Sequence, residues 1–423
     1  MRVNTIIVSS AVIILVGGWA TLSWTQGQTT PSAAPAGTPA PPQASRDLSK
    51  WPLWPKQFYL SGQRGNEWLQ RANGPDGRFI AGYVPALRVP LEAESYIRQV
   101  GAAIALAKAA KYFNDDKAAA KASQALLTLL LDTAPEDPSN PAIRIVTLPG
   151  GMTNRLGAAA ALVQAIHELP QPGADLLDQA DQLCNAIRRA QRTDGSLCCT
   201  DPGPDGKFAA DDNETVNLYS GEALYALMRS QQHRPAAWKL DLVKNAVPYY
   251  QARWRSNKTL TLIPRHTAAN AEAYLQTGDK AFADFVFEMN DWLCTFQYHQ
   301  LDPQHPLWVG GFMSCVDGKP VKTPPHAISA AYAECLGDAA RVARKAGDLQ
   351  RWERYKGALE RSLQFLLTLQ YTDANCQHFN PEFRPFVVGA FHASNQDGNI
   401  RLDYTQQAVC AMVSYLTHVA DIP

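Results

Sequence analysis

Gly101-Ala-Ala-Ile-Ala-Leu-Ala107 is the stretch that decides the fold, because two similar stretches follow it: Gly157-Ala-Ala-Ala-Ala-Leu162 and Gly221-Glu-Ala-Leu-Tyr-Ala-Leu227. Each begins with glycine and continues in alanine and leucine, so each predicts a helix that neighbours can approach closely on every side. A unit that recurs in this way indicates a repeat architecture. We therefore expect these helices to form an inner ring.

The helical pattern continues from about residue 60 onward and comes in pairs, in which a helix of small residues precedes one rich in Leu, Phe and Trp. Links such as Thr277-Gly278-Asp279 are short, with glycine ending one helix and aspartate opening the next, so each pair is predicted to be an antiparallel hairpin. The six inner helices are expected at 96–113, 154–169, 218–230, 265–276, 325–345 and 402–419, and five outer partners at 116–132, 175–191, 237–254, 280–297 and 349–370.

A glutamine at the end of an outer helix, followed by a turn and then by an aromatic residue or leucine, also recurs. It occurs as Gln191 to Leu197, Gln297 to Phe312 and Gln370 to Phe391, and again as Gln70 with Asp76-Gly77-Arg-Phe79 before the first inner helix. The stretch 61–72 is therefore predicted to be the sixth outer helix, which pairs with 402–419 and closes the circle. The long Gly- and Pro-rich loops, at 133–153, 192–217, 298–323 and 371–401, all lead into inner helices and should gather on one face.

This pattern of six inner helices, an outer ring and Gln…Asp-Gly-aromatic turns resembles the α/α-toroid superfamily, which includes the six-hairpin glycosidases and the terpenoid cyclase and prenyltransferase rings. The resemblance covers nearly everything after residue 60. It implies an all-α domain, an (α/α)6 toroid of helical hairpins, over 51–423. Because it is architectural, the function has to be argued from the residues of the central funnel.

The N-terminus predicts export. Met1-Arg2-Val3-Asn4 precedes an apolar run over 5–24, long enough to cross a hydrocarbon core of roughly 30 Å. The run is long for a cleaved signal peptide, which favours an uncleaved anchor within 1–25. A Pro-, Ala- and Thr-rich linker follows over 26–50. We expect a single-pass protein of the cell membrane with an exported C-terminal domain, or a secreted or periplasmic protein if the segment is cleaved.

Composition excludes several classes of function. The 39 Lys and Arg balance the 39 Asp and Glu, and no basic run carries interleaved aromatic residues, so no nucleic-acid partner is expected. No P-loop, HExxH, GxSxG or CxxC motif occurs, and we predict no cofactor and no metal. The stretch 201–212 imitates a calcium loop but lacks an oxygen ligand at its third position. Cys184 is either a buried thiol or a disulfide partner of Cys198 or Cys199.

Polar side chains recur where the inner helices begin, and in a ring these starts point into one shared space with free backbone N–H groups. Individually they could cap or bridge helices, but so many ionisable groups in a dry core would be costly. Glu222, Asp403 and Asp212 are the predicted catalytic carboxylates. The predicted substrate-binding residues are Arg98, Arg155, Tyr219, Arg265, His266, His326 and Tyr404, and Glu94, Tyr96, Asn154 and Arg401 occupy similar positions.

A carboxylate pair across a funnel is what glycoside cleavage requires, with one group protonating the leaving oxygen and the other activating water or attacking. Arg98, Arg155 and Arg265 favour an acidic sugar and leave a uronate lyase or epimerase open. The main prediction is a carbohydrate-active protein with a poly- or oligosaccharide in its funnel. The alternatives are a non-catalytic binding or scaffold protein of the envelope and, less favoured by the polar helix starts, an isoprenoid-handling ring.

Overall fold

The structure, a computed structural model, describes residues 46–92, 95–149, 152–200 and 212–422. The predicted membrane segment, nearly all of the linker, Glu94 and the calcium-like stretch 201–211 lie outside these ranges. Within them no helix is both long and apolar enough to cross a membrane. The residues from Leu48 onward, beginning with the short 3-10 turn η1 (Leu48–Lys50), pack as one unit.

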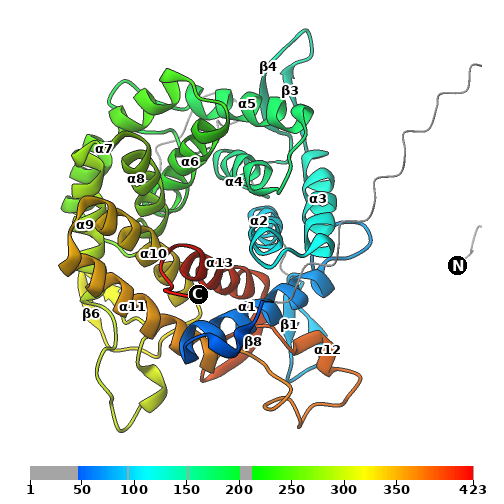
Figure 1. Ribbon diagram of the computed structural model, residues 1–423. Coiled ribbons are helices and arrows are strands. Elements are labelled where there is room, and N and C mark those ends of the chain that lie inside the picture. The colour runs from blue at the N-terminus through cyan, green and yellow to red at the C-terminus, as the bar shows by residue number, and fades with distance from the viewer. Residues whose placement is uncertain (1–45, 93–94, 150–151, 201–211, 423) are drawn as a thin grey trace, which may run out of the picture. The chain divides into compact units, whose positions relative to one another are not determined.

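Six helices surround the centre of this unit, and each packs against the inner helix before it and the one after it (Figure 1). The last of them packs against the first, so the circle is closed as predicted. The inner helices are α2 (Tyr96–Phe113), α4 (Arg155–Glu168), α6 (Asn213–His233), α8 (Ile263–Thr277), α10 (Ser329–Ala346) and α13 (Leu402–His418).

The close packing of this ring depends on its small residues. A Cβ added to Gly221 would lie 2.7 Å from the backbone nitrogen of His266 and 2.9 Å from the carbonyl carbon of Arg265, closer than real Cβ contacts allow. Helix α6 can therefore lie directly against the backbone of α8 only because residue 221 has no side chain. The alanine-rich stretches beside the glycines are buried throughout, as a helix with neighbours on every side must be.

Six further helices form an outer ring, each packed on an inner helix. The N-terminal helix α1 packs on α13 and so provides the sixth outer helix, which confirms the predicted closure. It is longer than expected, because it begins at Leu53 behind Pro52. The outer helices are α1 (Leu53–Ala72), α3 (Asp116–Leu130), α5 (Ala174–Arg189), α7 (Ala237–Ser256), α9 (Lys280–Cys294) and α11 (Leu349–Thr368).

The loops that lead into the inner helices contain short strands that the sequence did not predict. Four of them form one antiparallel sheet in the order β2-β1-β8-β7, in which Gly82 of β1 lies opposite Arg401 of β8. The loop before α2 and the loop before α13 therefore meet on the face where the inner helices begin, as expected. The remaining elements are β1 (Gly82–Val84), β2 (Val89–Pro90), β3 (Thr133–Asp137), β4 (Asn140–Val146), β5 (Ser314–Val316), β6 (Lys319–Val321), β7 (His392–Ser394), β8 (Asp397–Arg401), η2 (Pro306–Trp308) and α12 (Arg384–Val387).

The recurring glutamines connect neighbouring outer helices. The Nε2 of Gln191 donates to Leu242 O in α7 at 2.9 Å, that of Gln297 to Ala358 O in α11 at 2.8 Å, and that of Gln370 to Ser61 O in α1 at 3.0 Å. Each glutamine also forms an isolated bridge with the Leu or Phe that ends its turn. In the first turn Asn73, not Gln70, takes this place and pairs with Phe79.

Gly389 shows why the turn contains glycine. Its φ of +97° is a conformation that L side chains rarely adopt, and an added Cβ would lie 2.4 Å from Arg64 O in α1. The turn thus lies directly on the backbone of the next outer helix. For Gln370 and Gly389 that next helix is α1, so the repeat extends across the junction between the two ends of the ring.

Replacing Gln370 with alanine should lower the free energy of unfolding by about 1–3 kcal/mol. The side chain is buried, donates to Ser61 O and Gly389 O, and accepts from Ser61 Oγ at 2.7 Å, so truncation leaves these buried groups without partners. Urea unfolding of Gln370→Ala against Gln377→Ala, a matched glutamine whose bond to Asp373 O lies on the surface, measures the difference. Equal midpoints for the two variants would contradict this role.

Candidate functional site

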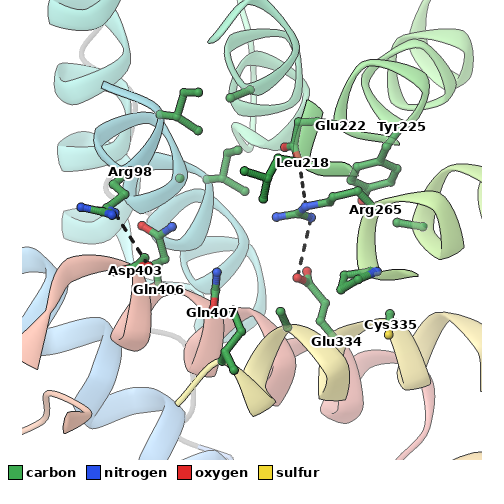
Figure 2. A pocket seen from close by; sticks show the side chains of 18 of the residues that line it. Arg98, Leu218, Glu222, Tyr225, Arg265, Glu334, Cys335, Asp403, Gln406 and Gln407 are labelled. Atoms are coloured by element: carbon green, nitrogen blue, oxygen red, sulfur yellow. Dashed lines mark ion pairs between the residues drawn. The ribbon is translucent and has the colours of Figure 1, made fainter. Parts of the chain in front are cut away.

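A cavity of about 330 Å³ lies at the centre of the ring and receives side chains from all six inner helices (Figure 2). It opens among the N-terminal halves of the helices, where the sequence placed the funnel. Its size is near the lower end of the roughly 300–1,000 Å³ that small-ligand sites occupy. The polar residues that line it are Ser95, Arg98, Tyr219, Glu222, Tyr225, Thr261, Arg265, Tyr332, Glu334, Asp338, Asp403, Gln406 and Gln407.

Arg265 on α8 lies between two glutamates, as Figure 2 shows. Its Nε is 2.7 Å from Glu222 Oε2, and its Nη1 is 3.8 Å from Glu334 Oε2. The other oxygen of Glu222 accepts from Gln164 Nε2 at 2.8 Å, and the other oxygen of Glu334 accepts from Lys108 Nζ at 2.7 Å. Two carboxylates and two cations thus alternate in one chain of contacts, in which Glu222, Arg265 and Glu334 line the cavity and Lys108 lies outside its lining.

A second cluster lies at the rim and centres on Asp403. Arg401 binds it in a bidentate manner, from Nε to Oδ1 at 2.6 Å and from Nη2 to Oδ2 at 2.8 Å. Arg98 Nε is 3.8 Å from Oδ2 and is only loosely paired. Behind this cluster the ring of Tyr404 lies under the Arg401 guanidinium at 4.5 Å and meets the edge of His326 at 4.9 Å.

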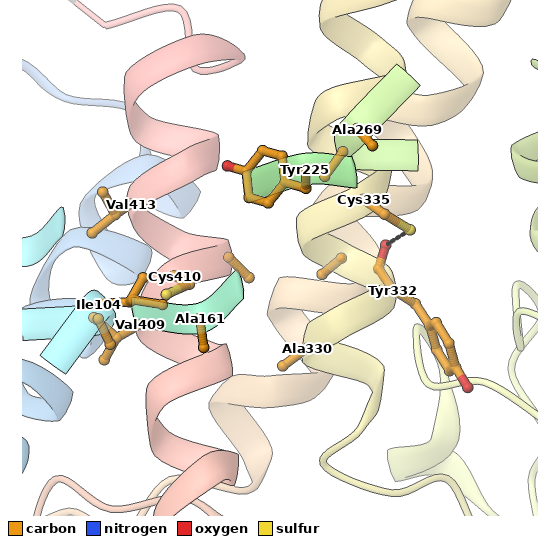
Figure 3. Close-up of a cluster of buried hydrophobic side chains, with 14 of the residues drawn as sticks. Ile104, Ala161, Tyr225, Ala269, Ala330, Tyr332, Cys335, Val409, Cys410 and Val413 are labelled. Carbon is orange, nitrogen blue, oxygen red and sulfur yellow. Dashed lines mark hydrogen bonds between the residues drawn. The ribbon is translucent and has the colours of Figure 1, made fainter. Parts of the chain in front are cut away.

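Below the cavity the ring is filled. Ile104, Ala161 and Tyr225 line the cavity and belong to the same buried hydrophobic cluster as Val409 and Cys410, which lie further along α13 (Figure 3). Nearer the C-terminal ends of the inner helices, Glu168 pairs with Lys111 and Arg229, and Glu272 pairs with Arg341. The cavity therefore has a packed floor and opens toward the loops.

The charges of this floor are strongly coupled. Burial alone would raise the pKa of the Glu168 carboxyl, but Arg229, Lys108 and Lys111 outweigh it and lower the pKa to about 2. In the cavity above, burial raises the pKa of Tyr219. Glu168 is thus a fixed anion of the floor, whereas Tyr219 can offer a neutral hydroxyl to a ligand.

Five of the ten predicted site residues line the cavity: Arg98, Tyr219, Glu222, Arg265 and Asp403. Tyr404 and His326 do not line it but pack behind Asp403. His326 was expected in the first turn of an inner helix, yet α10 begins three residues later, at Ser329. It therefore belongs to the loop that precedes the helix.

His266 lies outside the cavity lining and is almost completely buried, with 1% of its surface exposed. Its Nε2 is 2.9 Å from Ser220 Oγ, its ring packs on Tyr250 at 4.7 Å, and burial lowers its pKa to about 3. Successive residues point about 100° apart on a helix. Since Arg265 faces the funnel, His266 has to face the outer ring.

Asp212 and Arg155 also lie outside the lining. Asp212 is the N-cap of α6, where it accepts from Thr215 N at 2.7 Å and from Thr215 Oγ1 at 2.6 Å. Arg155 turns back to the preceding loop and donates from Nε to Leu148 O at 3.2 Å. Both residues perform the local structural role that polar residues at helix starts commonly have.

Glu334, Asp338 and Lys108 were not singled out from the sequence, although the first two line the cavity and the third binds Glu334. They lie more than one turn into their helices, whereas the prediction considered helix starts. The sequence does contain a signal, because Glu334 and Asp338 are four apart in a helix of small residues and so share one face.

Neither a disulfide of Cys184 nor a metal cluster is present in the part of the chain that the structure describes. Cys184 is a buried free thiol, and burial raises its pKa to about 11. Among the described residues no group of three or more His, Cys, Asp or Glu side chains is arranged to hold a metal ion.

No protein-family model and no curated protein sequence matches this chain. Solved structures do. An unsaturated glucuronyl hydrolase specific for heparin matches with a TM-score of 0.59 and 13% identity over 86% of this chain and 96% of the other. A D-mannose isomerase matches with a TM-score of 0.59 and 12% identity, over 86% and 99%.

An α-1,6-mannanase of Salegentibacter sp. HEL1_6, solved in complex with α-1,6-mannotriose, matches with a TM-score of 0.56 and 10% identity over 85% of this chain and 99% of the other. The likenesses extend over nearly the whole of each structure. At these identities they bear on the fold and not on the residues of the site. The chain has the (α/α)6 toroid fold of the six-hairpin glycosidase-like enzymes.

Proposed function

We propose that this chain is a carbohydrate-active protein that binds a saccharide in the funnel and acts on it by carboxylate acid–base chemistry. The observation that carries the proposal is the cavity itself, into which five of the six inner helices direct carboxylates, guanidinium groups, amides and hydroxyls. Such groups match the many donors and acceptors of a sugar. An isoprenoid site would instead require a lining with few charges, whereas six charged side chains line this cavity: Arg98, Glu222, Arg265, Glu334, Asp338 and Asp403.

The similar structures support the same conclusion. The hydrolase, the isomerase and the mannanase are all named for sugar substrates, and one of them contains an α-1,6-linked mannotriose. The size of the cavity suits a mono- or disaccharide unit, with a longer chain extending through the mouth.

Arg98 makes an acidic sugar the preferred ligand. It is loosely paired with Asp403, and a third of its side chain is exposed. Arg265 is less available, because Glu222 and Glu334 flank its guanidinium. A carboxylate on the sugar would therefore find its best partner in Arg98.

Glu222→Gln should weaken saccharide binding by about tenfold or more, because the substitution removes a charged acceptor from the cavity and releases Arg265. Isothermal titration calorimetry with α-1,6-mannotriose, cellobiose and a glucuronate-containing disaccharide measures the affinity. Glu353→Gln, at an exposed site on α11, is the matched control. Arg98→Gln should reduce the affinity for the acidic disaccharide most. The proposal fails if no saccharide binds, or if Glu222→Gln binds as the wild type does.

One observation favours non-catalytic binding as the second candidate. One oxygen of Glu222 accepts an amide hydrogen bond and the other is ion-paired with Arg265, and both oxygens of Asp403 accept from Arg401, so neither residue is an obvious proton donor. Turnover of a saccharide that binds decides between the two functions. Binding without release of product over a range of pH would establish the second.

We also propose that the ring is exported and tethered through the apolar run 5–24, on the basis of its length and the linker that follows. Protease treatment of intact cells should then remove the ring domain, and membranes should retain the chain after a carbonate wash. A chain found in the cytosolic fraction would contradict export.

A further inference from the structure

We infer that Glu334 and Asp338, on one face of α10, are the acid–base pair of the funnel, with Asp338 carrying the proton. This inference rests on the proposed function and names its chemical groups. Both residues line the cavity, and residues four apart lie one above the other, with Cβ atoms about 5–6 Å apart. A ligand in the cavity therefore meets two carboxyl groups at once.

The two groups have opposite surroundings. Glu334 is bound by Lys108 Nζ at 2.7 Å and has Arg265 Nη1 at 3.8 Å, so two cations face it. Asp338 accepts from a single cation, Arg341 Nη1, at 3.0 Å. Its other oxygen, Oδ2, accepts no hydrogen bond from any residue that the structure describes. That oxygen is free to carry a proton and to present it to a ligand.

The pKa values of the two carboxyl groups are also shifted in opposite directions. Burial raises the pKa of Asp338 to about 6 and outweighs the opposing effect of Arg341. Burial would also raise the pKa of Glu334, but Lys108 and Arg265 reverse the direction and lower it. Paired carboxyls whose pKa values are driven apart mark an acid and a base. The charged and titratable groups that face Asp338 are Arg341, Glu334 and Cys335 on α10, Glu272 on α8, Lys108 on α2, and Tyr225 and Arg229 on α6.

This pair supplies what Glu222 and Asp403 lack. In hydrolysis, Asp338 gives its proton to the glycosidic oxygen as the bond between that oxygen and the anomeric carbon breaks. A water oxygen bonds to the anomeric carbon, and Glu334 takes the proton that the water loses. Transfer of that proton from Glu334 to Asp338, one helical turn away, restores the starting state with no further reactant. Glu222 and Asp403 then orient the sugar.

A carboxyl titration tests the inference without requiring a substrate. In the full chain labelled with [¹³C]carboxyl aspartate, the resonance that is lost in Asp338→Asn should titrate with a midpoint near pH 6 in the wild type. A midpoint near the ordinary value of 3.8 would overturn the inference. Asp284→Asn, at an exposed position on α9, is the matched control and should leave that resonance in place.

Thermal unfolding provides a second readout with a defined sign. Because the pKa of Asp338 is higher in the folded chain than in the unfolded one, its protonation stabilises the fold at low pH, and that stabilisation is lost as the pH rises from about 4 through about 6. The Tm of Asp338→Asn relative to the wild type should therefore rise across this interval. A Tm difference between Asp338→Asn and the wild type that stays constant across this pH interval would contradict a protonated Asp338, even if both proteins fold well.

Turnover separates this inference from the proposed function. On a saccharide that binds the wild type, Asp338→Asn should lower kcat about 10²- to 10⁴-fold and remove the alkaline limb of the pH profile, while the affinity for the saccharide is retained. Glu334→Gln should remove the acidic limb. Absence of any saccharide binding would defeat the proposed function. Binding with wild-type turnover in Asp338→Asn would defeat the acid–base assignment alone.

Discussion

Phe58→Ala is expected to lower the free energy of unfolding by about 3–5 kcal/mol. Phe58 on α1 is completely buried and packs edge-on against Tyr415 of α13 at 5.3 Å, so it lies in the contact that joins the first outer helix to the last inner one. Truncation leaves a cavity in that contact, which lies between segments at opposite ends of the chain. The measurement is urea unfolding followed by circular dichroism.

The control for this prediction is Phe386→Ala. Phe386 lies on α12 with 47% of its surface exposed, and its truncation should cost less than about 1 kcal/mol. If α1 were an appendage and not part of the ring, Phe58→Ala would melt α1 locally and leave the main transition unchanged. An unchanged midpoint would therefore contradict closure through α1.

Arg265→Met should lower the free energy of unfolding by about 2–4 kcal/mol, because Glu222 loses its cation and Glu334 loses one of two. This loss is at the lower end of the free-energy cost of breaking a buried ion pair, because about a third of the arginine side chain is exposed. Arg253→Met is the control, because the only hydrogen bond of the Arg253 side chain to a residue that the structure describes is the one to Asn213 Oδ1 at the surface. It should cost less than about 0.5 kcal/mol.

A double-mutant cycle assigns the loss to its source. Arg265→Met alone leaves the Glu222 carboxylate without its cation, and adding Glu222→Gln removes that charge. The free energy of unfolding of the double variant should therefore be about 1–3 kcal/mol higher than the sum of the two single losses predicts. Strict additivity would show that Arg265 contributes only packing. In that case the alternating charges of the cavity wall would not act as one network.

The fold was largely predictable because short local stretches of sequence determine it. The glycines and alanines at 101–107, 157–162 and 221–227 predict helices that pack closely on their neighbours, and the contact of Gly221 with α8 confirms this prediction. The repeated turn at Gln70 and Phe79 predicted the helix that closes the circle. The short strands were missed because stretches such as Val89–Pro90 are too brief to show alternation and depend on pairing with distant loops.

The site was half predictable. The expectation that site residues lie where the inner helices begin found Arg98, Arg265 and Asp403, because the funnel does open at the helix starts. That expectation does not determine which way a side chain points, and adjacent residues such as Arg265 and His266 point in different directions around the helix. It also depends on predicting the first residue of each helix correctly, and α10 begins at Ser329, after the predicted start.

Glu334 and Asp338 show the limit more sharply. Their spacing is visible in the sequence, but their opposite surroundings come from Lys108, Arg265 and Arg341, the first two of which belong to helices far away along the chain. The environment that turns two similar carboxyls into an acid and a base is therefore a property of the closed ring.

A crystal structure of the chain soaked with a saccharide that binds in solution tests the central claim most directly. The sugar should occupy the cavity between Arg98, Glu222 and Arg265, with one of its oxygens within about 3 Å of Asp338 Oδ2. A saccharide bound at saturation anywhere else on the ring, with the cavity free of it, would contradict the account.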